Sequence, residues 1–145
     1  MTPVNPLSMV GLMLTLASLL GSFFYIQLSQ WLRDVMALST KIEMAELGNQ
    51  EENKKAVREC RIEQTRLSSW HTYVVNLVVI GFVWFILETG LRMIEMARSD
   101  PTHGPIHCAF VVFEVIFLGL SAILFGLGVY HNVQNGRTLA KLPKG

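Results

Sequence analysis

Three long apolar blocks constrain what this chain can fold into more than any other feature of its sequence. They run from about 7 to 28, from about 73 to 92 and from about 109 to 130. Each is long enough to cross about 30 Å of hydrocarbon, which takes roughly 20 helical residues. We therefore expect an all-α integral membrane protein with three transmembrane helices in the lipid bilayer, forming a single domain over residues 1–145.

The first block is predicted to be a retained span and not a cleaved signal peptide. No basic residue precedes it, its apolar stretch is too long, and the first positive charge of the chain, Arg33, follows it. The net charge of +1 gives no basic surface suited to nucleic acid. The sequence also lacks a phosphate loop, a serine nucleophile elbow and paired zinc-binding motifs, so we expect no enzyme and no bound metal.

The distribution of positive charge predicts the orientation. Seven basic residues lie between positions 29 and 71, whereas none precedes the first block. Because positive charge is retained on the cytoplasmic side, we expect the N-terminus outside and the C-terminus inside. A bacterial inner membrane fits this charge bias and the short chain.

The two connections differ in chemistry. Between about 29 and 71, apolar residues recur at helical spacing on both sides of a turn at Gly48, which predicts a cytoplasmic helical hairpin that extends the first and second spans. The apolar face of that hairpin implies a helical partner, either another copy or a soluble protein. The second connection, about 98–107, contains two prolines and a glycine and is predicted to be a tight outer loop.

A stripe of small and polar residues follows the first block along its whole length. Its members recur every three or four residues: Ser8, Gly11, Thr15, Ser18, Ser22, Tyr25 and Ser29. This spacing places them on one face of a helix and is typical of a helix that packs against other helices or lines water. Three roles are open for this polar stripe: contact within the monomer, contact between protomers, and lining of a pore.

Three charged residues, Glu88, Arg92 and Glu114, lie near the outer ends of the second and third blocks. Ionisable residues are costly in hydrocarbon, so they are informative there. A tight loop joins these antiparallel blocks, so we expect the three residues to form a charge cluster in which Arg92 pairs with either carboxylate. The cluster is either an outer-leaflet ion or proton site, with one carboxylate unpaired, or a salt bridge that locks the two helices together.

The third block also offers surfaces for helix contact and a histidine near its inner end. Glu114, Ser121 and Gly128 repeat every seven residues, and Gly119, Ala122 and Gly126 form a small-residue surface. His71 and His131, both near the predicted inner boundary, leave a haem-bearing anchor as an alternative to a protein without cofactor. Histidine is nevertheless ordinary at a membrane boundary.

These features favour a non-enzymatic, homo-oligomeric channel or pore subunit in which the first span lines or packs around the axis. The main alternative is a structural or accessory subunit that uses the same surfaces to dock onto other membrane subunits. The order of elements resembles the ExbB/TolQ type of proton-channel subunit: an outer N-terminus, one span, a charged helical inner connection, two further spans and an inner tail. That resemblance covers topology alone and implies a homo-oligomeric ring.

Overall fold

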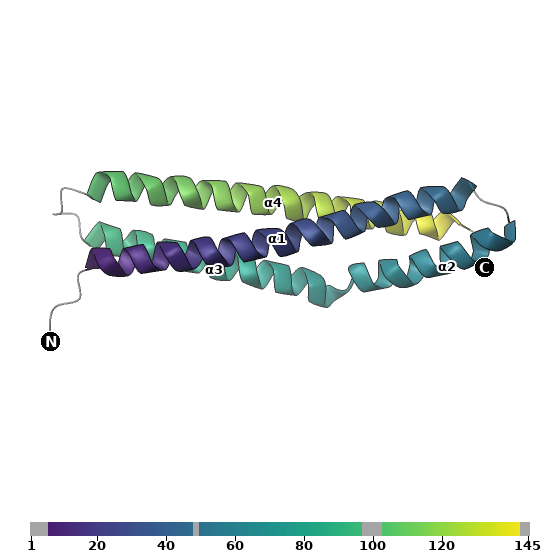
Figure 1. The fold of residues 1–145 in the computed structure, drawn as a ribbon, viewed down its shortest axis with the longest axis horizontal. Coiled ribbons are helices and arrows are strands. Elements are labelled where there is room, and N and C mark those ends of the chain that lie inside the picture. The colour runs from purple at the N-terminus through teal and green to yellow at the C-terminus, as the bar shows by residue number, and fades with distance from the viewer. Residues whose placement is uncertain (1–5, 48–49, 97–102, 143–145) are drawn as a thin grey trace. The chain divides into compact units, whose positions relative to one another are not determined.

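The structure, a computed structural model, describes residues 6–47, 50–96 and 103–142. These residues form four helices and no strand (Figure 1): α1 (Pro6–Leu47), α2 (Gln50–Leu67), α3 (Trp70–Met96) and α4 (His103–Lys141). Three helical stretches are long and apolar enough to cross a membrane: Ser8–Glu46, Lys54–Met96 and Gly104–Lys141. The predicted all-α class and the three candidate spans are therefore confirmed.

Helices α1, α3 and α4 are all longer than the apolar blocks that predicted them, and the extensions of α1 and α4 are the largest. Helix α1 continues past the first block to Leu47, as the apolar spacing after position 29 predicted. Helix α4 begins at His103 and ends at Lys141, whereas its predicted span covered only about 109–130. Pro105 is tolerated in its first turn, where backbone N–H groups have no helical partner. The predicted turn at Gly48 and most of the predicted outer loop lie outside the described residues.

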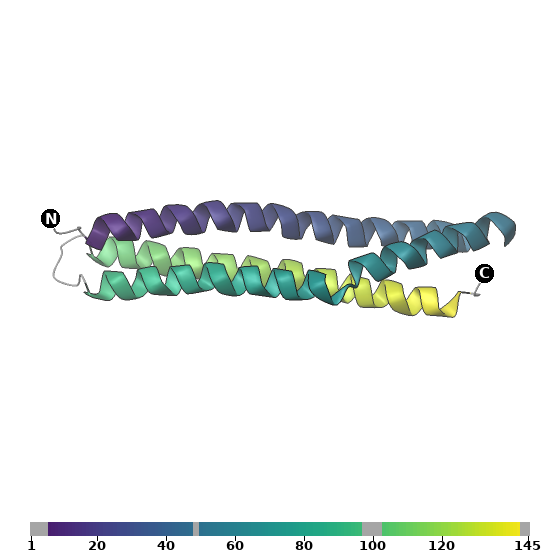
Figure 2. The same cartoon turned by 90° about the horizontal axis from the view of Figure 1, so that it is seen from below.

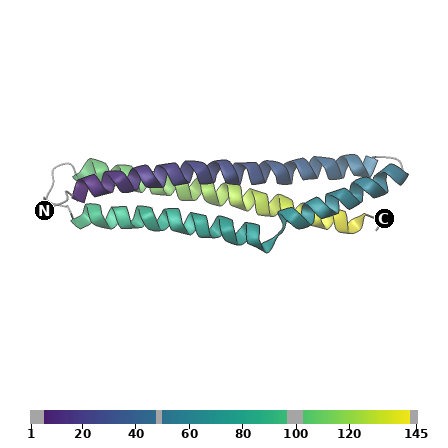
Figure 3. The same ribbon diagram turned by 60° about the horizontal axis from the view of Figure 1, so that its bottom comes forward.

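A break separates α2 from α3 at Ser68 and Ser69, where the sequence predicted one continuous helix. Figure 3 shows the interruption of the ribbon between the two helices. The backbone N–H of Ser68 still donates to the carbonyl of Gln64 at 2.9 Å, while that of Thr72 donates to Ser69 at 2.9 Å. Ser69 thus lies where one helix has ended and the next begins, a position that serine favours.

The described chain divides into two compact units, to which α1, α3 and α4 each contribute a part. Unit 1 comprises Met1–Ile26 and Leu77–Ala122. Its apolar core joins the three helices and is formed by Val10, Ala17, Val83, Leu87, Ile94 and Phe110. Gly90 permits the close approach of α4, because a Cβ there would lie 2.6 Å from the Phe110 ring.

Unit 2 comprises Gln27–Asn76 and Ile123–Gly145. Within it, α2 lies beside the second part of α1 (Figure 2), and Lys41 Nζ of α1 pairs with Glu63 Oε2 of α2 at 2.8 Å. The centre of this unit is aromatic: the Trp31 ring stacks on Phe125 at 5.9 Å between centroids and meets Tyr73 edge-on at 6.0 Å. Such pairs add to the free energy gained by burial.

Burial on α1 follows a strict seven-residue repeat. Val10, Ala17, Phe24, Trp31, Leu38 and Ala45 are buried, and so are Gly21, Leu28, Val35 and Ile42, which follow the same period. A seven-residue period is the geometry of left-handed helix packing, in which one face of a helix stays against its neighbours. One face of α1 therefore supplies the core in both units.

Gly128 provides a test of the aromatic centre of unit 2. A Cβ at this position would overlap the Trp31 ring, whereas a Cβ at Gly126 of the same helix meets no atom within 4 Å. We expect Gly128→Ala to lower the free energy of unfolding by about 1–3 kcal/mol through overpacking. Gly126→Ala, the matched control, should leave it unchanged or raise it by about 0.5–1 kcal/mol. Unfolding in detergent followed by circular dichroism measures both, and equal effects would contradict the packing.

Candidate functional site

The polar stripe of α1 lies outside the core of the protein. Gly11, Thr15, Ser22 and Tyr25 are exposed, and Ser18 is half-buried. Five of the stripe residues follow a buried position by one place, as Ser18 follows Ala17 and Ser22 follows Gly21, while Thr15 follows the half-buried Leu14. One residue turns the chain about 100° around a helix, so the stripe forms a second face beside the buried one.

The stripe residues differ in how their hydroxyl groups are satisfied. Thr15 donates its hydroxyl hydrogen to the carbonyl of Gly11 at 2.9 Å, one turn earlier in the same helix. Such a bond satisfies the hydroxyl without a partner from another helix. The hydroxyls of Ser18 and Ser22 make no hydrogen bond with the part of the chain that the structure describes. The half-buried Ser29 does interact within the chain.

The three predicted charge-cluster residues separate into two interactions in unit 1. Arg92 Nε lies 3.1 Å from Glu88 Oε1, one turn away on α3. Glu114 of α4 instead accepts a hydrogen bond at 2.8 Å from Nε1 of Trp84, which lies on α3. Of the two carboxylates that the sequence offered to Arg92, the structure thus pairs it with Glu88.

Trp84 contacts the predicted charge cluster, and sequence analysis did not identify it. It precedes Glu88 by four residues and Arg92 by eight, so all three lie along one face of α3. The indole N–H is a donor with no charge of its own, and its carboxylate partner is on another helix. The bond therefore links α3 to α4 within unit 1.

The two predicted surfaces of α4 differ in burial. Ser121 and Gly128, which repeat with Glu114 in sequence, are both buried. Gly119, Ala122 and Gly126 are exposed, and a Cβ at either glycine would meet no atom of the chain within 4 Å. The predicted small-residue surface is therefore open to a neighbouring molecule.

Unit 2 contains a buried polar group that sequence analysis also missed. Asn132 of α4 is 1% exposed, and its Nδ2 donates to the Tyr73 hydroxyl of α3 and, at 3.4 Å, to the Leu67 carbonyl that ends α2. The backbone carbonyl of Asn132 accepts a hydrogen bond from Gln64 Nε2 at 2.8 Å. We refer to Gln64, Leu67, Tyr73 and Asn132 as the Asn132 cluster.

Two further side chains extend the polar contacts of unit 2. Asn135, which is also buried, donates to the Val35 carbonyl of α1 at 2.9 Å. Arg61 of α2 donates to the carbonyls of Leu139 and Leu142 at 3.2 and 3.0 Å, where α4 ends. A cation beside the final carbonyls of a helix is favourable because those carbonyls have no helical donor. A spacing of three and four residues from Asn132 through Asn135 to Leu139 is the signal that could have revealed this face of α4.

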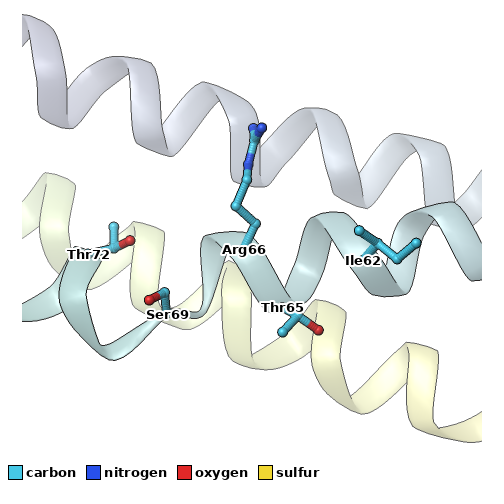
Figure 4. Close-up of a pocket in the computed structure, with 5 residues that line it drawn as sticks. All are labelled: Ile62, Thr65, Arg66, Ser69 and Thr72. Carbon is cyan, nitrogen blue, oxygen red and sulfur yellow. The ribbon is translucent and has the colours of Figure 1, made fainter.

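An open hollow borders the break between α2 and α3. Figure 4 shows the residues that line it: Ile62, Thr65, Arg66, Ser69 and Thr72. Thr65 donates its hydroxyl hydrogen to the Arg61 carbonyl at 2.9 Å.

Of the histidines considered for haem, His71 is exposed and His131 is half-buried. Among the described residues, no group of three or more His, Cys, Asp or Glu side chains is arranged to hold a metal ion.

Comparison with protein-family models, with curated proteins and with solved structures found no match. Roles for the residues above therefore follow from their chemistry and geometry alone.

A double-mutant cycle tests the bond between Trp84 and Glu114. Trp84→Phe removes the donor and Glu114→Met removes the acceptor of this hydrogen bond, so we expect a coupling of about 1 kcal/mol in the free energy of unfolding. Arg92→Gln combined with Glu114→Met should be additive and serves as the control. Coupling of Glu114 to Arg92 and not to Trp84 would contradict the observed pairing.

The two cysteines provide a pH test of unit 2. Cys60 is buried in α2, whereas Cys108 in α4 is exposed. Burial, together with the neighbouring Glu63 carboxylate, raises the pKa of the Cys60 thiol above its usual value. Because alkylation requires the thiolate, we expect Cys108 to react first and Cys60 to react appreciably only at more alkaline pH. Mass spectrometry after timed alkylation measures both, and equal rates at neutral pH would contradict the burial of Cys60.

Proposed function

We propose that this chain is a non-enzymatic subunit of a homo-oligomeric membrane channel or pore, in which α1 helices of several copies meet along the polar stripe. The observation that carries the proposal is that α1 has two adjacent faces with the same seven-residue period. One is buried within the chain, while the described chain leaves Gly11, Thr15, Ser22 and Tyr25 of the other exposed. A heptad-spaced face of small and polar residues suits packing against a further helix.

Energetics also support an assembly. In the first span the exposed stripe runs beside large exposed apolar residues such as Leu12, Leu19 and Phe23, which suit lipid. A hydroxyl without a partner is costly in hydrocarbon, and Ser18 and Ser22 have no bond within the described chain. A neighbouring copy or water along an axis would provide that partner.

The remaining parts of the proposal follow from charge. With the N-terminus outside, as the positive-inside rule predicts, Glu114 lies toward the outer leaflet of what we propose is a bacterial inner membrane. A carboxylate at that depth would favour cations and would set charge selectivity or gating. Trp84 supports this role because its indole N–H fixes one carboxylate oxygen and leaves the second available.

An accessory subunit is the second candidate, favoured by the open surface of Gly119, Ala122 and Gly126 on α4. Small residues at such a surface let the backbone of another helix approach closely. In that role the polar stripe and the α4 surface would dock onto a different membrane subunit.

Ser22→Leu tests the proposed assembly. A leucine in a closely packed face costs about 1–3 kcal/mol, so association should weaken by about 5- to 150-fold. Phe23→Leu, at the neighbouring exposed position, changes a side chain that we assign to lipid and should have no effect. Native mass spectrometry in detergent measures the oligomeric state of both variants beside the unaltered chain.

The same variants separate the two functions. A channel requires a closed ring of identical copies and ion flux in liposomes, with the flux lost in Ser22→Leu and retained in Phe23→Leu. A monomer without flux, copurifying with other membrane subunits at fixed stoichiometry, would overturn the channel and support the accessory role.

A further inference from the structure

The open hollow beside the break between α2 and α3 lies where a polar helix is followed by an apolar one. Charged residues recur along α2 as far as Arg66, whereas the first acidic, lysine or arginine residue of α3 is Glu88. Ile62 and Trp70, which lie on either side of the break, are both exposed. An exposed tryptophan at the end of an apolar helix is typical of the boundary between hydrocarbon and lipid headgroups. The hollow therefore opens at the depth of the headgroups.

The end of the hollow nearest α3 offers hydrogen-bond donors. Arg66, Ser69 and Thr72 line this end (Figure 4). The Arg66 guanidinium and the two hydroxyls make no hydrogen bond or ion pair with the part of the chain that the structure describes. Thr65 differs, because its hydroxyl already donates to the Arg61 carbonyl. A guanidinium beside two hydroxyl donors suits the oxygens of a phosphate group.

The end farther from α3 offers acceptors. A smaller depression along α2 shares Ile62 and Arg66 with the hollow and is also lined by Glu59 and Glu63. Glu63 Oε2 pairs with Lys41 Nζ at 2.8 Å, whereas Glu59 makes no hydrogen bond or ion pair with any described residue. Two carboxylates disfavour a ligand that is only anionic and suit one that also carries a cation.

We propose that this hollow binds the headgroup of a phospholipid that carries both a phosphate and a primary ammonium group, as phosphatidylethanolamine does. The phosphate accepts hydrogen bonds from Arg66 and from the hydroxyls of Ser69 and Thr72. The ammonium group donates to Glu59 and Glu63. The occupant is a lipid and not a soluble phosphate compound, because the phosphate end of the hollow borders the apolar helix, along which acyl chains can lie. This inference requires that α3 spans a membrane and is independent of whether the chain forms a pore.

Lipid titration of the full chain in detergent, followed by native mass spectrometry, tests the proposal. Phosphatidylethanolamine, phosphatidylglycerol and phosphatidylcholine with identical acyl chains are compared. We expect the first to bind about three- to tenfold more tightly than the others. Phosphatidylglycerol lacks the ammonium group, and the trimethylated ammonium of phosphatidylcholine has no hydrogen to donate.

Two substitutions distinguish the ends of the site. Arg66→Gln removes the cation and should weaken the binding of phosphatidylethanolamine about three- to tenfold. Glu59→Gln should instead reduce the preference for phosphatidylethanolamine over phosphatidylglycerol. Arg137→Gln is the matched control, because Arg137 is exposed on α4 and does not line the hollow. It should bind all three lipids as the unaltered chain does.

Three outcomes would overturn the proposal. Equal binding of the three lipids to the unaltered chain would do so, whether or not any variant folds. Binding of free phosphoethanolamine as tight as that of the lipid would assign the site to a soluble ligand. Equal losses in Arg66→Gln and Arg137→Gln, with helix content retained by circular dichroism, would show attraction to positive charge in general and no site at the hollow.

Discussion

The seven-residue repeat of buried residues on α1 is the constraint on which the rest of the structure depends. Val10 and Ala17 enter the core of unit 1, while Trp31 and Leu38 belong to unit 2, and all four lie on one helix face. Because a single face supplies both units, the remaining faces of α1 point outward over the same length. The exposure of the polar stripe is a direct consequence, since Gly11, Ser22 and Tyr25 each follow a buried position by one place.

Each of the two units is stabilised internally by different chemistry. In unit 1 the core is apolar, and its polar contacts, such as Trp84 with Glu114, lie at the surface. Unit 2 instead buries the amides of Asn132 and Asn135, which donate to backbone carbonyls of other helices. Apolar packing tolerates small shifts between helices, whereas directional bonds do not. We therefore expect hydrogen bonds to fix the helix register more strongly in unit 2.

Sequence patterns predicted the features of this fold that depend on hydropathy alone. The three spans could be predicted because their length and apolar content are local properties. The continuation of α4 beyond Tyr130 could not, because that segment is polar and its buried face consists mainly of asparagine. The break at Ser68 was also missed, since neither proline nor glycine marks it. For Glu114, charge suggested Arg92 as partner, whereas the observed donor, Trp84, depends on cross-helix register that no local pattern reveals.

The hydroxyl groups of the polar stripe differ in whether they are hydrogen-bonded, and this difference indicates what each part of the stripe contacts. Near its start, Gly11 has no side chain and Thr15 donates to the Gly11 carbonyl, so this part presents a smooth surface that needs no polar partner. Further along, Ser18 and Ser22 have hydroxyls without a bond in the described chain. A neighbouring helix would suffice for the first part, while the second requires a polar group or water. If the stripe meets water anywhere, the middle of the first span at Ser18 and Ser22 is therefore the place where its chemistry favours it.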